Sequence, residues 1–190
     1  MVRGILFVLS GPSGVGKGTI LDRLMNDFNG IKYSISVTTR KPRKDEKDGI
    51  DYFFVSTEKF QEMKREDLFL ETACVHGNYY GTPQKYVEHC LSKGEDVILE
   101  IDIQGARQIK NKFKDTVYIF LLPPNNKELK NRLKKRNSET LESLKKRLKN
   151  ADQEISEVNN YDYSIVNDQI EKTVQEIKKV IKKERSLRKE

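Results

Sequence analysis

A glycine-rich loop near the N-terminus limits the fold more than any other stretch of this sequence. Residues 11–19 read GPSGVGKGT, directly after an apolar run at residues 4–9 that is typical of a buried strand. The pattern after the loop predicts an amphipathic helix that runs to about Phe28. In this order of strand, loop and helix, backbone N–H groups and the helix N-terminus surround an anion, and Lys17 adds a cation. We therefore predict that a polyphosphate binds here.

The predicted polyphosphate site has one unusual position. Loops of this kind have Ser or Thr immediately after the lysine to bind magnesium, whereas this chain has Gly18 there and Thr19 one place later. A magnesium contact would then run through water or through the nucleotide oxygens alone. The residues predicted to surround the phosphates are Gly11, Pro12, Ser13, Gly14, Val15, Gly16, Lys17, Gly18 and Thr19.

The composition excludes several classes of protein. A chain of 190 residues with 36% hydrophobic residues fits one ordinary domain and not a disordered segment. The net charge of +7 admits anionic partners, but the lysine runs are typical of solvated helix faces and no nucleic-acid recognition motif accompanies them. Cys74 and Cys90 have neither metal-site spacing nor a disulfide pattern. No secretory pattern or membrane-length apolar run is present, so we expect a cytoplasmic protein without membrane or specific nucleic-acid partners.

The rest of the chain predicts a parallel α/β core. Apolar runs at residues 96–102, 117–122 and 163–166 are typical of strands, and helical patterns alternate with them. This alternation favours a parallel sheet with helices on both faces, whose ligands lie beyond the carboxyl ends of the strands. The glycine loop and the acids Glu100 and Asp102 both fall at such ends.

Two stretches depart from this alternation. Short strand-like pieces and one helix between residues 31 and 93 indicate a small mixed subdomain inserted into the core. Thr82 and Pro83 predict the start of a helix, with the threonine as its cap. Farther along, two arginine-bearing helices flank a break at residues 137–138, and we predict that this hairpin is a lid over phosphates. The elements expected in the subdomain are strands at 33–38, 51–55 and 69–75 and a helix at 57–65.

Several polar segments follow the glycine loop in an order that identifies a family. These segments are SISVTTRKPR at 34–43, GIDYFF at 49–54, Glu71, GNYYGT at 77–82 and DIQG at 102–105. Together with the loop they resemble the guanylate kinases, and the resemblance covers about residues 3–185. It implies one domain at 1–190 with a phosphate-loop core, an inserted GMP-binding subdomain and a helical lid. The implied subregions are the core at 1–32, 94–125 and 156–190, the GMP-binding part at 33–93 and the lid at 126–155.

The resemblance implies a guanine pocket whose chemistry can be checked against the residue types. Guanine has an acceptor at O6 and donors at N1 and N2, so its pocket needs carboxylates and hydroxyl groups. By resemblance, Glu71 and Asp102 accept from the ring, whereas Ser36 and Thr82 donate to O6. The residues implied to bind the GMP phosphate are Arg40, Arg43, Tyr52 and Tyr80.

The resemblance also implies an ATP site. The lid arginines Arg132, Arg136 and Arg147 are expected to reach the ATP phosphates, and Asn167 matches a position near the adenine. Phosphoryl transfer needs positioning and charge neutralisation more than a general base. The implied catalytic residues are Lys17, Arg40, Arg132, Arg136 and Arg147. Thr19 and Glu100 are candidate contacts to Mg²⁺, through water.

These residues predict an enzyme of purine nucleotide metabolism and GMP recycling. It would transfer the γ-phosphate of ATP to GMP, and also to dGMP, with Mg²⁺. Two alternatives stay open: a non-catalytic guanylate-kinase-like module that binds a phosphorylated protein, and another nucleoside monophosphate kinase, because Gly-Lys-Gly-Thr also resembles adenylate kinases. Taken singly, Arg40 could be a surface arginine, and Thr82 and Asp102 could be only helix caps. Whether the protein is a monomer or a homo-oligomer is left open.

Overall fold

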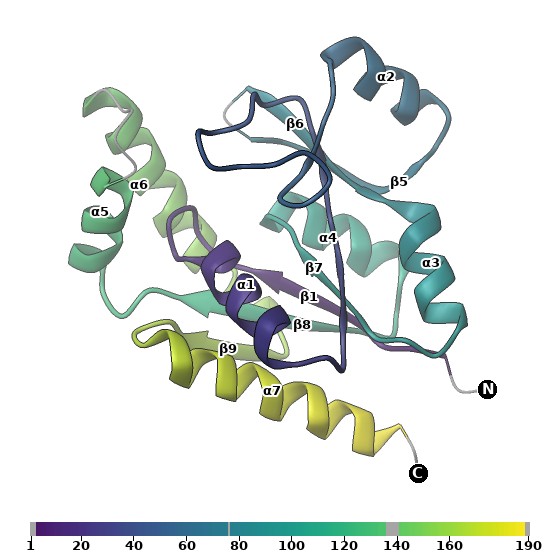
Figure 1. Ribbon diagram of the computed structural model, residues 1–190. Coiled ribbons are helices and arrows are strands. Elements are labelled where there is room, and N and C mark those ends of the chain that lie inside the picture. The colour runs from purple at the N-terminus through teal and green to yellow at the C-terminus, as the bar shows by residue number, and fades with distance from the viewer. Residues whose placement is uncertain (1–2, 76, 136–140, 189–190) are drawn as a thin grey trace. The chain divides into compact units, whose positions relative to one another are not determined.

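The computed structural model describes residues 3–75, 77–135 and 141–188 and divides the chain into two compact units. The first unit contains residues 1–8 and 30–116, and the second contains residues 9–29 and 117–190. The boundary falls within the first strand, β1 (Leu6–Ser10), so that each unit holds part of it (Figure 1).

Strands and helices alternate through most of the described chain, as the periodicity predicts. The other strands are β2 (Lys32–Ser34), β3 (Val37–Thr38), β4 (Phe53–Phe54), β5 (Phe69–Val75), β6 (Asn78–Pro83), β7 (Val97–Glu100), β8 (Thr116–Leu122) and β9 (Tyr163–Val166). The α-helices are α1 (Lys17–Asp27), α2 (Thr57–Arg65), α3 (Gln84–Ser92), α4 (Ile103–Lys112), α5 (Asn126–Lys135), α6 (Leu141–Ile155) and α7 (Ile170–Leu187).

Five strands form the core sheet in the order β2-β7-β1-β8-β9. In the first unit β2 pairs with β7 in parallel, with Lys32 opposite Val97, and in the second unit β8 pairs with β9 in parallel, with Ile119 opposite Tyr163. The central strands are apolar along most of their length because both faces are covered, and Phe7 is 0% exposed. Their polar residues stand at strand ends, namely Ser10, Glu100 and Thr116. The predicted parallel α/β core is confirmed.

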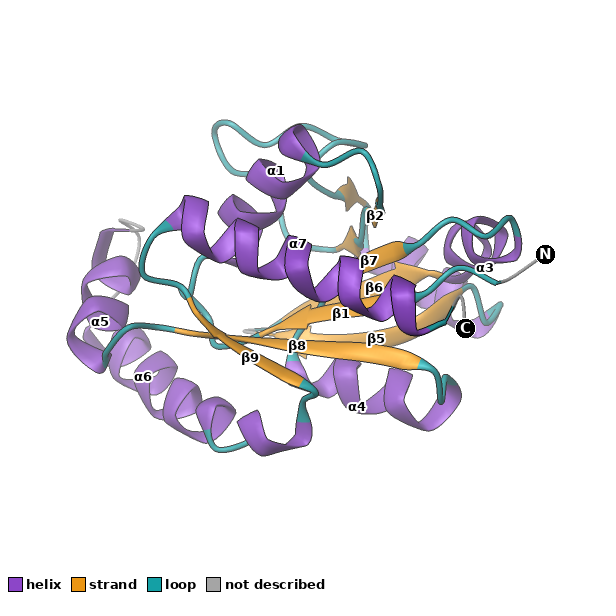
Figure 2. Ribbon diagram, turned by 90° about the horizontal axis from the view of Figure 1, so that it is seen from below, coloured by secondary structure: helices purple, strands orange, loops and turns teal. Residues whose placement is uncertain are grey.

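In the second unit, helices cover both faces of the sheet. Helix α7 packs against both α1 and β9, and Figure 2 shows α7 lying along β8 and β9 while α6 lies on their other face. The buried side of α7 carries Val174, Ile177 and Ile181 at helical spacing. Among the described residues, no helix is both long and apolar enough to cross a membrane.

The first unit holds a second, four-stranded sheet in the order β4-β3-β6-β5. Its small core is aromatic: the Phe60 ring of α2 lies 4.7 Å from the Phe69 ring and 5.5 Å from the Tyr79 ring, centroid to centroid. Ser56 caps α2, since its hydroxyl accepts from the Lys59 N–H at 3.2 Å. This sheet is the small mixed subdomain that the sequence predicts.

Two sequence predictions in this region are wrong. The strand predicted at 33–38 is two strands in different sheets, because β2 pairs with β7 whereas β3 pairs with β4 and β6. Thr82 and Pro83 do not begin a helix; they end β6, and α3 begins at Gln84 without a side-chain cap. The Thr82 hydroxyl instead donates to the buried Glu71 carboxylate.

Candidate functional site

The glycine loop of the second unit has the backbone shape of an anion site. Gly16, directly before α1, has a left-handed backbone with φ of 101° and ψ of 25°, which an L side chain rarely adopts. Gly14 has φ of 84°, and a Cβ atom there would lie 2.7 Å from the Leu133 side chain of α5. The loop therefore needs glycine at both positions. Lys17 opens α1, and its ammonium donates to the Gly11 carbonyl at 2.7 Å.

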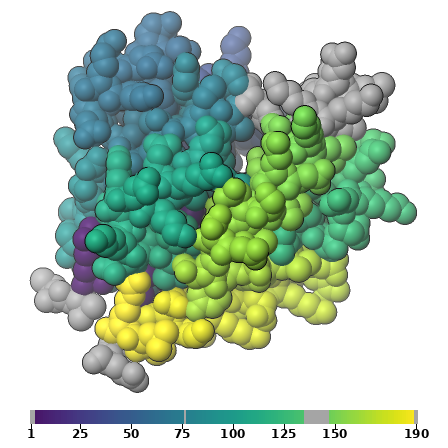
Figure 3. Space-filling model, turned by 180° about the vertical axis from the view of Figure 1, so that it is seen from behind, coloured from purple at the N-terminus to yellow at the C-terminus, as the bar shows by residue number. Residues whose placement is uncertain are grey.

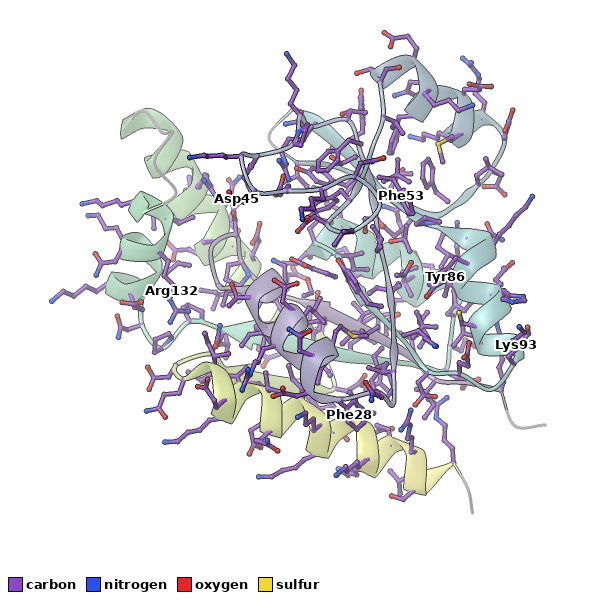
Figure 4. The ribbon with its side chains drawn as sticks, in the orientation of Figure 1. Phe28, Asp45, Phe53, Tyr86, Lys93 and Arg132 are labelled. Atoms are coloured by element: carbon purple, nitrogen blue, oxygen red, sulfur yellow. The ribbon has the colours of Figure 1, made fainter. Side chains whose placement is uncertain are left out.

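Side chains of α5 and α6 contact this loop directly. Arg132, labelled in Figure 4, donates from Nη1 to the Val15 carbonyl at 3.1 Å and from Nε to Glu128 at 2.9 Å. Arg147 is 8% exposed, and its Nη2 donates to the Ser13 hydroxyl at 2.7 Å. The predicted lid arginines Arg132 and Arg147 thus lie at the predicted phosphate loop, whereas Arg136 lies outside the described residues.

Leucines fasten α5 to α6 beside the loop. Leu129 and Leu133 pack with Ala151 of α6, and all three side chains are buried. Helix α6, light green in Figure 3, has its other side at the surface. Glu154, three residues after Ala151 and therefore on nearly the same face of α6, accepts from the Ser13 N–H at 3.2 Å. The inner ends of the two helices therefore form part of the loop's surroundings.

Asn167 supports the loop from the end of β9. Its amide is 4% exposed and donates to the Val15 carbonyl at 2.8 Å, while its Oδ1 accepts from the Thr173 hydroxyl at 3.1 Å. The side chain thus takes part in shaping the loop. Its predicted contact with adenine stays a prediction.

In the first unit, four of the predicted GMP residues gather around a carboxylate that the sequence reading missed. Glu46, one residue after the Asp45 labelled in Figure 4, accepts from both terminal nitrogens of Arg40, at 2.8 and 2.9 Å. It also accepts from the Arg43 N–H at 2.8 Å and from its side chain at 3.3 Å. Burial opposes ionisation, but these hydrogen bonds lower the pKa of Glu46.

Two tyrosines complete this basic cluster. The Arg40 guanidinium lies over the Tyr52 ring at 5.4 Å, and the Tyr52 and Tyr80 rings meet edge to face at 6.0 Å. Burial raises the pKa of the Tyr52 phenol, and the charge of Glu100 adds to the effect. Tyr52 is therefore a neutral hydrogen-bond donor at physiological pH, and together with two guanidinium groups it suits a phosphate.

A second cluster of the first unit holds a buried acid. Glu71 on β5 is 3% exposed, and its Oε1 accepts from the Thr82 hydroxyl at 2.7 Å. Burial, with a smaller contribution from the nearby Asp102 charge, raises the pKa of Glu71 to about 7, although the hydrogen bonds from Thr82 act in the opposite direction. Asp102 also caps α4, because its Oδ1 accepts from the Gly105 N–H at 2.9 Å. The cap was the structural alternative for this residue, and it leaves the charge of Asp102 close enough to act on Glu71.

The other predicted site residues are Ser36, Thr19 and Glu100. Ser36 is 5% exposed, and its backbone carbonyl accepts from the Phe53 N–H at 2.9 Å. Thr19 is exposed on the first turn of α1, and Glu100 ends β7. The described residues contain no group of three His, Cys, Asp or Glu side chains that could hold a metal ion by themselves. Magnesium retains water and binds phosphate oxygens through few protein ligands, so a single hydroxyl or carboxylate of the chain, acting through water, fits a metal that arrives with a nucleotide.

Comparison with known proteins gives one consistent family. The family model described as guanylate kinase matches residues 3–184. The chain is 51% identical over 183 residues to a guanylate kinase of Latilactobacillus sakei, covering 96% of this chain and 90% of the relative. It is 52% identical over 179 residues to one of Clostridium perfringens, covering 94% and 83%.

The solved structures agree. A crystal structure of guanylate kinase from Anaplasma phagocytophilum matches with a TM-score of 0.82 at 38% identity, over 96% of this chain and 87% of that one. A structure of TT1252 from Thermus thermophilus has a TM-score of 0.57 at 15% identity, over 96% and 98% of the two chains, which shows a shared fold alone.

Proposed function

The chain belongs to the guanylate kinase family, and we propose that it transfers the terminal phosphate of ATP to GMP, giving ADP and GDP. The comparisons confirm the prediction of a kinase of this family. The buried pair of Glu71 and Thr82 carries the choice of acceptor. A carboxylate can accept from guanine N1 and N2, and a hydroxyl can serve O6.

Selectivity against AMP follows from the same pair. Adenine has a donor where guanine has O6 and an acceptor at N1, so it would leave the buried Glu71 carboxylate without a donor from the base. A site that hydrogen-bonds its substrate in this way rejects an analogue lacking those groups by about 10⁴ to 10⁵. We assign Ser36, Thr82, Glu71 and Asp102 to the base, and Arg40, Arg43, Tyr52 and Tyr80 to the GMP phosphate.

For the donor, we assign the ATP phosphates to the loop at residues 11–19. The left-handed glycines and the N-terminus of α1 favour an anion there. Lys17, Arg40, Arg132, Arg136 and Arg147 are assigned to neutralise charge on the moving phosphoryl group. Asn167, which directly follows β9, is assigned to the binding of the adenine of ATP.

Magnesium is the proposed cofactor, held mainly by phosphate oxygens and water, with Thr19 and Glu100 as candidate contacts through water. When bound with ATP it neutralises negative charge on the phosphate oxygens. We also expect dGMP to be an acceptor, and the protein to act in the cytoplasm without a membrane or specific nucleic-acid partner. These points and the subregion boundaries stay predictions.

A coupled assay of ADP release tests the proposed reaction. The purified protein is given ATP with GMP, dGMP, AMP, UMP or CMP in turn. We expect turnover with GMP and dGMP only. Turnover with AMP at the same rate as with GMP, or none with GMP, would reject the assignment. ATP binding measured by calorimetry distinguishes the enzyme from a non-catalytic module of the same family, which would bind no ATP.

A further inference from the structure

Helix α4 runs beside the outer edge of β5 and replaces a missing neighbouring strand with side chains. β5 is the last strand of its sheet, so its backbone groups on one side have no strand to pair with. Gln108 of α4 meets them twice: its Oε1 accepts from the Thr72 N–H at 3.1 Å, and its Nε2 donates to the Thr72 carbonyl at 2.7 Å. An amide side chain thus pairs with a backbone residue as another strand would.

Two further residues of α4 continue the pattern. Lys112 donates to the Leu70 carbonyl at 2.8 Å, and Gln104 donates to the Cys74 carbonyl at 3.4 Å. The repeat distances explain the match. Four helical residues rise about 6 Å, and two strand residues rise about 6.6 Å, so positions 104, 108 and 112 can face positions 74, 72 and 70 in turn.

The strand segment held in this way carries Glu71. Its neighbours Leu70 and Thr72 are the two residues whose backbones Lys112 and Gln108 bind. The helix also makes room for the carboxylate, because a Cβ atom at Gly105 would lie 2.4 Å from Glu71 Oε2. The Glu71 carboxylate therefore lies against the α4 backbone. The hydrogen bonds of Gln108 to Thr72 set the position of this part of β5 along the helix.

We propose that Gln108 is a positioning residue for guanine recognition, which acts by holding the part of β5 that carries Glu71. The inference rests on the proposed function, in which Glu71 accepts from guanine N1 and N2. Gln108 does not touch the base. Its two hydrogen bonds decide whether the Glu71 carboxylate meets the N1 and N2 donors at bonding distance, and that placement affects GMP more than an analogue without the N2 amino group.

The main variant is Gln108→Met, which keeps the length and the helix preference of the side chain but loses both hydrogen bonds. We expect the KM for GMP to rise about tenfold, since loss of two neutral hydrogen bonds typically has an effect of that size. We expect the KM for ATP to change less than about twofold, and the preference for GMP over IMP to fall, because IMP lacks the amino group at N2. Gln108→Glu keeps an acceptor for the Thr72 N–H and should lie between the variant and the wild type.

The matched control is Asn111→Ala, which removes an exposed amide from the same helix. It should leave both KM values unchanged. A double-mutant cycle then asks whether Gln108 acts through Glu71: in a Glu71→Gln background, Gln108→Met should add less than about twofold to the KM for GMP.

Three results would overturn the inference. The first is a Gln108→Met enzyme in which kcat falls equally with GMP and with IMP, while the KM for GMP and the preference for GMP over IMP do not change. The second is an equal effect of Gln108→Met with and without Glu71. If Gln108→Met does not fold, as judged by thermal melting, wild-type values for Gln108→Glu would be the third. Failure of the wild-type protein to use GMP would instead reject the proposed function.

Discussion

The donor loop at residues 11–19 and the acceptor loop at residues 40–52 are both predicted to bind phosphate, yet they are built from different groups. The donor loop presents backbone N–H groups shaped by left-handed glycines. The acceptor loop presents guanidinium groups, which the chain already balances with the Glu46 carboxylate at 2.8 and 2.9 Å from Arg40. A carboxylate also meets the donor loop, but there Glu154 accepts from a neutral N–H, that of Ser13, at 3.2 Å.

The difference lies in what each loop does before its substrate arrives. Charge-assisted hydrogen bonds to an arginine are roughly twice as strong as neutral ones, so Glu46 fixes Arg40 and reduces the net gain when a phosphate comes close. The donor loop has fixed dipoles and Lys17, which lies at the N-terminus of α1. We infer that the GMP phosphate either displaces the Glu46 carboxylate from the two arginines or shares them with it. The ATP phosphates, by contrast, would bind to a loop whose backbone already has the shape that they need.

The largest effect should come from removing the cation of the donor loop, Lys17. In Lys17→Met the transferring phosphoryl group loses a charge aimed at it, and we expect kcat to fall by roughly 10² to 10³, as when other preorganised electrostatic contacts are removed. Steady-state assays with ATP and GMP measure this. Lys130→Met, an exposed lysine of α5, is the matched control and should keep full activity. A Lys17→Met enzyme within threefold of wild type would mean that the loop's backbone carries the donor site alone.

Removing the arginine of the acceptor side should have the next largest effect. In Arg40→Met, kcat/KM for GMP should fall roughly 10- to 100-fold, because hydrogen bonds to a charged group contribute about 1.5 to 3 kcal/mol. Part of this loss arises because Glu46 is left without its main partner. The double variant Arg40→Met with Glu46→Gln should therefore recover part of the activity. If the second change lowers activity further instead, Glu46 does not balance Arg40.

The buried acid gives the acceptor side a pH dependence that the donor side should lack. Guanine needs Glu71 as a carboxylate, and burial raises the pKa of this group to about 7. The KM for GMP should therefore fall as pH rises through about 7, with a slope of up to tenfold per pH unit on the acid side. The groups acting on this carboxyl are Thr82, Asp102 and Lys112. The KM for ATP, measured over the same range, serves as the comparison and should follow a different profile.

The raised pKa of Glu71 should also make the free energy of unfolding depend on pH, but in the direction opposite to GMP binding. A carboxyl whose folded pKa is raised binds its proton more tightly in the folded state, so its stabilising contribution is complete below about 4.5 and lost as pH rises through about 7. Glu71→Gln removes this loss and should raise the free energy of unfolding at pH 8 by up to about 3 kcal/mol, while GMP binding weakens. Denaturation curves at pH 5 and pH 8 measure it. Equal curves for the two proteins at pH 8 would contradict the raised pKa.

The smallest effect should come from the carboxylate of the donor side. Glu154→Gln retains an oxygen that can accept from the Ser13 N–H, so we expect the KM for ATP to change by less than about threefold. Glu154→Ala, which loses the contact, should raise it further and leave the KM for GMP unchanged. If Glu154→Gln instead lowers the KM for ATP tenfold, the carboxylate competes with the phosphates, and the two loops resemble each other more than their geometry indicates.

The sequence predicted the groups that lie close together along the chain better than those brought together by folding. The glycine loop, its strand and its helix follow from local pattern alone. The helix start predicted at Thr82 is wrong because threonine before proline is a normal start for a helix, and only the pairing of β6 with β5 shows that the strand continues to Pro83. The single strand predicted at residues 33–38 is wrong because nothing in the local sequence marks the change from one sheet to the other.

The side-chain partners of the site residues were the part that the sequence could not supply, even where the partner is near in the chain, as Glu46 is to Arg40. Glu46 lies in a charged loop with five neighbouring charges, and no spacing singles it out as the partner of Arg40. Glu154 and Gln108 lie on amphipathic helices where their residue types are common on solvated faces. The assignment of arginines and tyrosines to the GMP phosphate came from the resemblance to the family and not from periodicity, and it stays a prediction.

The side chains of α4 along β5 have a consequence for the protein in crowded solution. An open strand edge can add the strand of another molecule and begin aggregation. The backbone carbonyls of β5 on this edge already accept hydrogen bonds from side chains of α4, namely Gln104, Gln108 and Lys112. A strand of another molecule therefore cannot pair with them. The helix that is proposed to position Glu71 would thus also keep the folded chain from pairing with a second copy through β5.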